Sequence, residues 1–183
     1  MDEYDIYYYI GNLDYKLIPK NGCSSLRFII TYLDDSKSVE HLLDSSPSSG
    51  YHMEWGKRWQ SIAGLYRGPR RNLGPSFAIK RDPVDRYVSA YDDVVRHRKL
   101  KFDWNDKHFR TQTSRAGVLD IYDHVFDLNE MNQVYDFIQE ELKKNIPHVH
   151  MRKNPHQDKT TLTTRQEAYI MKKYKEDYTN GWF

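Results

Sequence analysis

The stretch YKLIPKNGCSSLRFIITYL, residues 15–33, decides the fold of this chain. Its apolar beginning, at residues 15–19, predicts a short buried strand. The turn-forming segment KNGCSS follows, and apolar side chains then recur at helical spacing, at Leu26, Ile29, Ile30 and Leu33. The stretch therefore predicts a strand, a turn and a helix in that order.

A second unit of the same kind begins at residue 76. The apolar segment SFAIK, residues 76–80, predicts a strand, and VDRYVSAYDDVVRHRK, residues 84–99, predicts a long helix. Asp82 is placed to cap this helix, and Pro83 suits its first position because a missing N–H does no harm there. Asp85 favours the positive end of the helix dipole.

Two further helices are predicted nearer the C-terminus. One covers residues 130–144, and the other opens at Thr163 or Thr164 with Glu167 in the capping-box region. Short apolar strands that each feed a helix predict an α/β fold, with a parallel sheet covered on both faces.

Length and composition narrow the class of protein. A chain of 183 residues predicts one domain, 1–183, with a real core. Its 28 Lys and Arg nearly balance 26 Asp and Glu, so charge gives no reason to expect nucleic acid or an anionic membrane as partner. The single cysteine, Cys23, excludes an intrachain disulfide. No apolar run approaches a membrane span, and the acidic, aromatic start is unlike a secretory signal, so we expect a cytoplasmic protein.

Both units place polar residues where ligands bind in α/β sheets, beyond the carboxyl ends of the strands. In the first unit, Lys20 supplies charge, Gly22 permits close backbone approach, and the helix N-terminus attracts anions. In the second, Arg81 and Ser89 can converge on one phosphate. Each unit taken alone is also explained as an ordinary helix start. The lysine precedes the glycine, so the first loop is not a Walker A motif.

Two segments together resemble a known family. IPKNGCSSL, residues 18–26, and IKRDPVDRYVSAY, residues 79–91, resemble the paired signature of sulfotransferases that use 3′-phosphoadenosine 5′-phosphosulfate (PAPS). The version is similar to that of the carbohydrate sulfotransferases, the family 2 type. The C-terminal segments are similar to the closing pattern of the same family, at residues 125–142, 146–155 and 162–183.

The resemblance implies a fold, a donor and a set of donor-binding residues. The fold is a P-loop NTPase-like three-layer α/β fold with a central parallel sheet flanked by helices. The residues that match the 5′-phosphosulfate loop are Lys20, Asn21, Gly22, Cys23, Ser24 and Ser25. Arg81 and Ser89 match the pair that grips the 3′-phosphate. A sulfuryl group would pass in line from PAPS to a hydroxyl or amine, leaving the bisphosphate PAP and needing no metal.

The general base and the acceptor are less clearly marked. His52 is the first candidate for the base because its ordinary pKa lies near neutrality, and Glu54 is the second; the alternative is that both are loop residues. The nearest approach to a metal site, His148 with His150, lacks carboxylate partners. The resemblance implies a carbohydrate or another small hydroxyl-bearing acceptor.

Two basic segments are candidate acceptor surfaces, each with solvated surface as its alternative. The first contains Lys57, Arg58, Arg67, Arg70 and Arg71, and the second covers residues 96–104. Two other functions stay open, a catalytically silent module that binds a nucleotide or glycan, and a small phosphotransferase. The chain is expected to be a minimal bacterial or viral form of the family.

Overall fold

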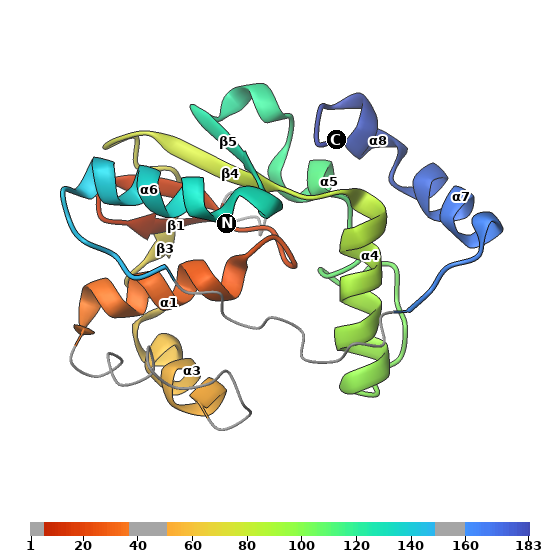
Figure 1. Ribbon diagram of the computed structural model, residues 1–183, viewed down its shortest axis with the longest axis horizontal. Helices are drawn as coiled ribbons and strands as arrows, with labels where there is room; N and C mark the ends of the chain where they lie inside the picture. Colours follow the sequence, from red (N-terminus) through yellow and green to blue (C-terminus); the bar gives the residue numbers. More distant parts are fainter. Residues whose placement is uncertain (1–5, 37–50, 149–159) are drawn as a thin grey trace.

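The computed structural model describes residues 6–36, 51–148 and 160–183, with the backbone alone at 51–56. Within them, five strands form one sheet in the order β3-β1-β2-β4-β5. They are β1 (Tyr7–Ile10), β2 (Leu13–Lys16), β3 (Arg67–Gly68), β4 (Ser76–Lys80) and β5 (His124–Asp127). Figure 1 shows the helices around this sheet.

The sheet is mixed, which corrects the prediction of a parallel sheet. Strands β2, β4 and β5 are parallel, whereas β1 runs antiparallel to both β2 and β3. The tight turn at Gly11 and Asn12 reverses the chain between β1 and β2, and Gly11 adopts a φ of 62°. Glycine is suited to this left-handed conformation because it has no Cβ to clash. The parallel prediction therefore holds for β2 and β4, which lead into the two predicted turns, and for β5 beside them.

Side chains alternate between the two faces of the sheet, as expected for strands buried on both sides. Tyr8, Tyr15 and Phe77 belong to the larger core cluster on one face. Tyr7 and Ala78, their neighbours in sequence, belong to a smaller cluster on the other face. The sheet is therefore the middle of three layers.

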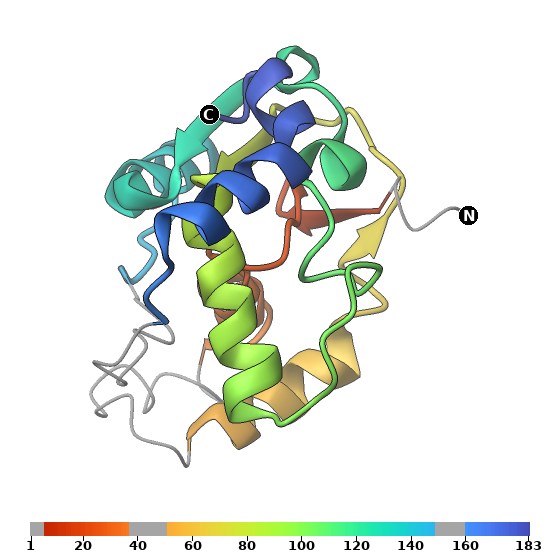
Figure 2. The same ribbon diagram turned by 90° about the vertical axis from the view of Figure 1, so that its right-hand side faces the viewer.

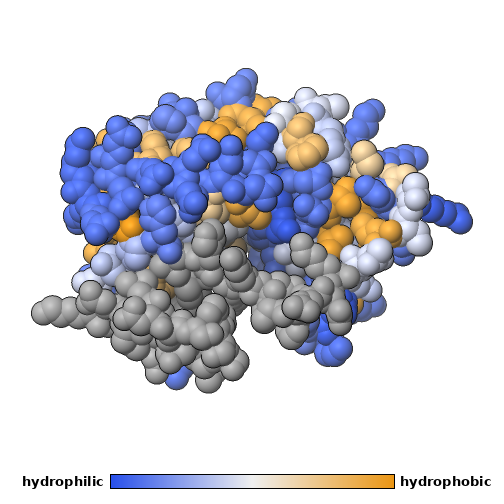
Figure 3. Space-filling model, viewed as in Figure 1, coloured by the Kyte–Doolittle hydropathy of each residue, from blue (hydrophilic) through white to orange (hydrophobic). Residues whose placement is uncertain are grey.

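Helices cover the larger face. This layer contains α1 (Cys23–Asp34), α3 (Tyr51–Ile62) and α6 (Met131–Leu142), which contribute Phe28, Trp59 and Val134 to its core. The buried residues of α6 share one side of the helix, and its opposite side is largely hydrophilic in Figure 3. Helix α6 confirms the helix predicted at residues 130–144. Strand β5, just before it, was not predicted.

The smaller face is covered by short elements from two parts of the chain, residues 112–121 and the C-terminal end. They are α5 (Gln112–Ala116), the 3₁₀ turn η4 (Leu119–Ile121) and the final segment, whose Trp182 is fully buried. The Trp182 Nε1–H donates a hydrogen bond of 2.8 Å to the carbonyl of Gly117. A second 3₁₀ turn, η5 (Leu128–Glu130), joins β5 to α6.

The predicted long helix after β4 forms two segments. Helix α4 (Pro83–Tyr91) begins as predicted, with the Asp82 carboxylate accepting the Asp85 backbone N–H at 2.7 Å. It continues as the π-helical segment η3 (Asp92–His97). Helix α7 (Thr164–Lys173) packs against α4, as Figure 2 shows, and α8 (Lys175–Thr179) follows. The capping box of α7 pairs Thr163 with Gln166 rather than Glu167, because Gln166 occupies the third helical position.

The parallel register of β2 and β4 brings the two predicted turns together. Lys16 lies opposite Ala78, so both strands end at the same edge of the sheet. The turn after β2 and the turn after β4 are therefore neighbours in space.

The side-chain amide of Gln112 ties these turns to each other. Its Oε1 accepts hydrogen bonds from Asn21 Nδ2 at 2.6 Å and from the Arg81 backbone N–H at 3.1 Å. Its Nε2 donates to the Arg81 carbonyl at 2.8 Å. Gln112 is itself fixed by Asp177, which accepts its backbone N–H at 2.9 Å. Gln112 and Asp177 are fully buried, so water cannot replace these bonds.

We expect Gln112→Ala to lower the free energy of unfolding by about 3 kcal/mol, because one N–H of the buried Asn21 amide and both backbone polar groups of Arg81 lose their bonds to Gln112. Gln133→Ala is the matched control, since Gln133 lies on the exposed side of α6. Urea denaturation of both variants measures the difference. Equal stabilities would contradict the role given to Gln112.

Candidate functional site

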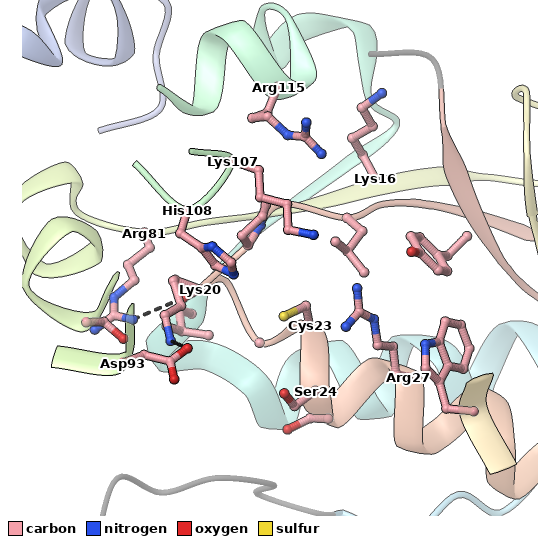
Figure 4. Close-up of a pocket in the computed structure, with 18 of the residues that line it drawn as sticks. Lys16, Lys20, Cys23, Ser24, Arg27, Arg81, Asp93, Lys107, His108 and Arg115 are labelled. Atoms are coloured by element: carbon pink, nitrogen blue, oxygen red, sulfur yellow. Dashed lines mark hydrogen bonds and ion pairs between the residues drawn. The ribbon is translucent and has the colours of Figure 1, made fainter. Parts of the chain in front are cut away.

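A pocket of about 780 Å³ opens at the edge of the sheet where β2 and β4 end. Figure 4 shows that side chains from the two turns and from the start of α1 point into it. Of the eight residues predicted to bind the donor, seven line the pocket: Lys20, Gly22, Cys23, Ser24, Ser25, Arg81 and Ser89. The structure thus brings both predicted motifs to one cavity.

The turn after β2 has an unusual backbone. Lys20 and Gly22 both have a φ of 74°, in the left-handed region. At Gly22 a side chain would also meet neighbours, since a Cβ would lie 3.1 Å from Met131 Sδ and 3.3 Å from Leu128 Cδ1. Glycine therefore suits this position on both counts. Helix α1 begins directly after it with Cys23 and Ser24, which line the pocket, whereas the N–H groups of Ser25 and Leu26 donate to the Gly22 carbonyl.

Lys20 is held at the pocket by an acidic partner that the sequence did not reveal. Its Nζ lies 2.7 Å from Asp93 Oδ2, and 16% of the side chain is exposed. Arg98 donates to the same Asp93 carboxylate, at 2.8 Å. Burial lowers the pKa of Lys20, although the bond to Asp93 acts in the opposite direction. Asp93 lies on the π-helical segment, which places its carboxylate beside the turn.

Arg81 reaches across to the first turn. Its NH1 donates a hydrogen bond of 3.0 Å to the Lys20 carbonyl, drawn as a dashed line in Figure 4. Burial lowers the pKa of Arg81, but a guanidinium stays charged at any physiological pH. Ser89, two turns into α4, lines the same pocket. Arg81 and Ser89 therefore border one pocket, and their contact with a phosphate stays a prediction.

Asn21 differs from the other predicted donor residues. Its side chain is fully buried and donates to the Ile79 carbonyl at 2.6 Å as well as to Gln112. Its backbone N–H donates to the Ile18 carbonyl at 3.2 Å. Asn21 therefore holds the turn in shape from behind rather than presenting its side chain to the pocket.

The pocket is strongly basic. Eight of its lining residues are Lys or Arg, against a single carboxylate, Asp93; they are Lys16, Lys20, Arg27, Arg67, Arg81, Arg98, Lys107 and Arg115. This excess of positive charge in a concave site favours an anionic ligand. Lys16 ends β2 and Arg27 lies one turn into α1. Because both flank the predicted turn, their place at the pocket could have been predicted from the sequence. Lys107 and Arg115 come from a segment whose position only the tertiary structure reveals.

His108 also lines the pocket and was missed by the sequence analysis. Its Nδ1 lies 2.6 Å from Asp106 Oδ1, and 16% of its side chain is exposed. Burial lowers the pKa of His108, and Lys20 and Arg98 act in the same direction. The sequence did contain one signal for a catalytic histidine, an aspartate two positions before it, at Asp106.

The predicted bases lie on α3, and their side chains, His52 and Glu54, are outside the described residues. Helix α3 does border the pocket, through Trp59 and Gln60, and so does Ala63 directly after it. His148 lies elsewhere, with its ring 4.9 Å from that of Tyr135. Three further histidines, His41, His150 and His156, fall outside the described part of the chain.

Most of the first predicted basic surface is engaged away from the pocket. Arg58 pairs with Asp34, Arg70 with Asp123 and Arg71 with Asp14. Arg67 alone of the described members lines the pocket.

In the second basic segment, Arg98 reaches the pocket, whereas Phe102 and Trp104 pack against Tyr87 of α4.

Across residues 6–36, 51–148 and 160–183, no cluster of potential metal ligands is found. The helices of these ranges include none long and apolar enough to cross a bilayer.

Comparison with known proteins agrees with this geometry. A family model described as "Sulfotransferase family" matches residues 12–116, which include both turns, Arg81, Ser89 and His108. No curated protein and no solved structure matched the chain. The family match spans more than half of the 183 residues and contains the residues that converge on the pocket, and on this ground the chain belongs to the sulfotransferase family.

Proposed function

We propose that the chain transfers a sulfuryl group from PAPS to a hydroxyl or amine of a small acceptor, a carbohydrate. One observation carries the proposal: Lys20, the N-terminus of α1, Arg81 and Ser89 all border one basic pocket. PAPS carries two anionic ends, a 5′-phosphosulfate and a 3′-phosphate. The pocket offers a group of donors for each end, and its volume of about 780 Å³ suits a nucleotide.

The 5′-phosphosulfate is assigned to the turn that ends at α1. The N–H groups of Cys23 and Ser24 and the positive end of the helix dipole favour an anion there. Lys20 supplies a full charge next to them. As the bond between sulfur and the phosphate oxygen breaks, negative charge grows on that oxygen, and these groups stabilise it. The ammonium group has three N–H donors, so Lys20 can bind the donor while it keeps its bond to Asp93.

The 3′-phosphate is assigned to Arg81 and Ser89. A guanidinium presents paired N–H donors that match phosphate oxygens, and the hydroxyl adds another donor. ATP has no 3′-phosphate and would leave this part of the site unused. The assignment therefore favours PAPS over an ATP-dependent phosphotransferase.

Calorimetric titration with PAP, ATP and 5′-AMP tests the donor class. We expect PAP to bind at least about tenfold more tightly than ATP, because charge-assisted hydrogen bonds to one phosphate contribute about 1.5–3 kcal/mol. Transfer of labelled sulfate from PAPS to glucosides, galactosides, N-acetylhexosaminides and glucuronides then tests for catalysis. Tighter binding of ATP would favour a phosphotransferase, and PAP binding without transfer to any acceptor or to water would favour a silent binding module.

We expect Arg81→Ala to weaken PAP binding by about 10- to 100-fold while adenosine 5′-phosphosulfate, which lacks the 3′-phosphate, changes little. Because Arg81 also bonds to the Lys20 carbonyl, Ser89→Ala serves as a second variant with the same expected ligand preference. The exposed Arg165 supplies the control, Arg165→Ala. If Arg81→Ala weakened the binding of both ligands equally, Arg81 would not be the contact to the 3′-phosphate.

We expect Lys20→Met to reduce kcat by about 100-fold or more, because the variant keeps the length of the side chain but loses the charge that stabilises the leaving phosphate. Lys144→Met, at an exposed position, is the control. Single-turnover transfer of labelled sulfate measures the effect. An unchanged kcat would refute the assigned role of Lys20.

A further inference from the structure

His108 has the setting of an acid–base group rather than of a surface histidine. It lines the basic pocket, and Figure 4 shows its ring between Lys20 and Lys107, on the opposite side of Lys20 from Asp93. Among the described side chains, His108 is the one histidine that lines this pocket. It therefore stands next to the lysine assigned to the transferred group.

Asp106 orients the imidazole. Its Oδ1 lies 2.6 Å from His108 Nδ1 and also accepts the His108 backbone N–H at 2.8 Å, which fixes both residues in one short turn. Burial opposes ionisation of Asp106, but the hydrogen bonds from His108 hold the pKa of this carboxyl below its ordinary value. An ionised carboxylate accepts hydrogen bonds only, so Nδ1 carries the proton. The lone pair is then on Nε2, where it can accept another proton.

Burial and the surrounding cations favour the neutral imidazole. Lys20 approaches from the turn after β2 and Arg98 from the end of the π-helical segment, where both pair with Asp93. Together with burial, which is the larger effect, these cations lower the pKa of His108 despite Asp106. A neutral imidazole is the form that a general base requires.

We propose that His108 is the general base of sulfuryl transfer and that Asp106 is its positioning residue. This proposal rests on the proposed function. The acceptor oxygen forms a bond to sulfur as the bond from sulfur to the 5′-phosphate oxygen breaks. The electron pair of the broken bond stays on that phosphate oxygen, and PAP leaves. The proton of the acceptor hydroxyl passes to His108 Nε2. Water can take the place of the acceptor in the same step, which yields free sulfate.

The experiment compares His108→Gln with the control His148→Gln, which alters an exposed histidine outside the pocket. Transfer of labelled sulfate to the best acceptor of the panel above is measured in single turnover, together with release of sulfate to water. We expect both rates to fall about 100-fold or more in His108→Gln and PAP affinity to stay within about twofold. A parallel loss of PAP affinity would make His108 a donor contact and overturn the proposal, as would unchanged rates.

Asp106→Asn tests the positioning role by a pH profile. Asp106 raises the pKa of His108, so its removal lowers that pKa and moves the acid limb of the rate profile to lower pH. A merely structural residue would lower the rate equally at every pH, and that result would overturn the positioning role. Thermal unfolding and PAP titration check that each variant is folded.

The variants His52→Gln and Glu54→Gln separate this proposal from the alternative bases. If either loses the rate while His108→Gln keeps it, the base lies on α3 and the proposal fails. If the unaltered protein neither binds PAP nor releases sulfate from PAPS, the proposed function fails instead. If both the unaltered protein and the His108→Gln variant transfer sulfate, the proposed function stands and only the assignment of His108 as base fails.

Discussion

The site depends on one buried hydrogen-bonded group, the side-chain amide of Gln112. It bonds to Asn21 behind the first turn and to both backbone polar groups of Arg81 in the second. Asp177 fixes Gln112 in turn, by accepting backbone N–H groups at the start of α5. Because these bonds are buried, breaking one leaves a polar group unsatisfied, and this cost keeps two turns about sixty residues apart in sequence in one geometry.

Concentrated positive charge is the second constraint on the structure. Cations that line one pocket repel each other, and burial adds a desolvation cost that lowers the pKa of Lys20 and Arg81. Asp93 relieves part of this cost by pairing with Lys20 and Arg98. An anionic donor would relieve more of it. Binding of an anion thus offsets both the repulsion between the cations and their desolvation, and this favours a multiply charged ligand.

Much of the fold follows from local patterns. The strand β4 and the helices α1, α4 and α6 were predicted because apolar spacing and the Asp82 cap are local properties. The strand predicted at residues 15–19 begins and ends earlier, as β2 (Leu13–Lys16). Strand β5 and the hairpin strand β1 were not predicted, because short strands acquire their stability from neighbours far along the chain. Gln166 rather than Glu167 completes the α7 cap because the exact first residue of a helix depends on packing.

The sequence alone determined the two motifs, their order and the residue types able to hold two anionic groups, because each motif is a local strand, turn and helix. Only the tertiary structure decided which residues join them. The parallel register of β2 and β4 places Arg81 against Lys20, and the fold turns Asn21 inward. It also brings Asp93 and His108 to the pocket from segments that lie outside the two motifs. Their positions depend on long-range packing, which no stretch of sequence encodes by itself.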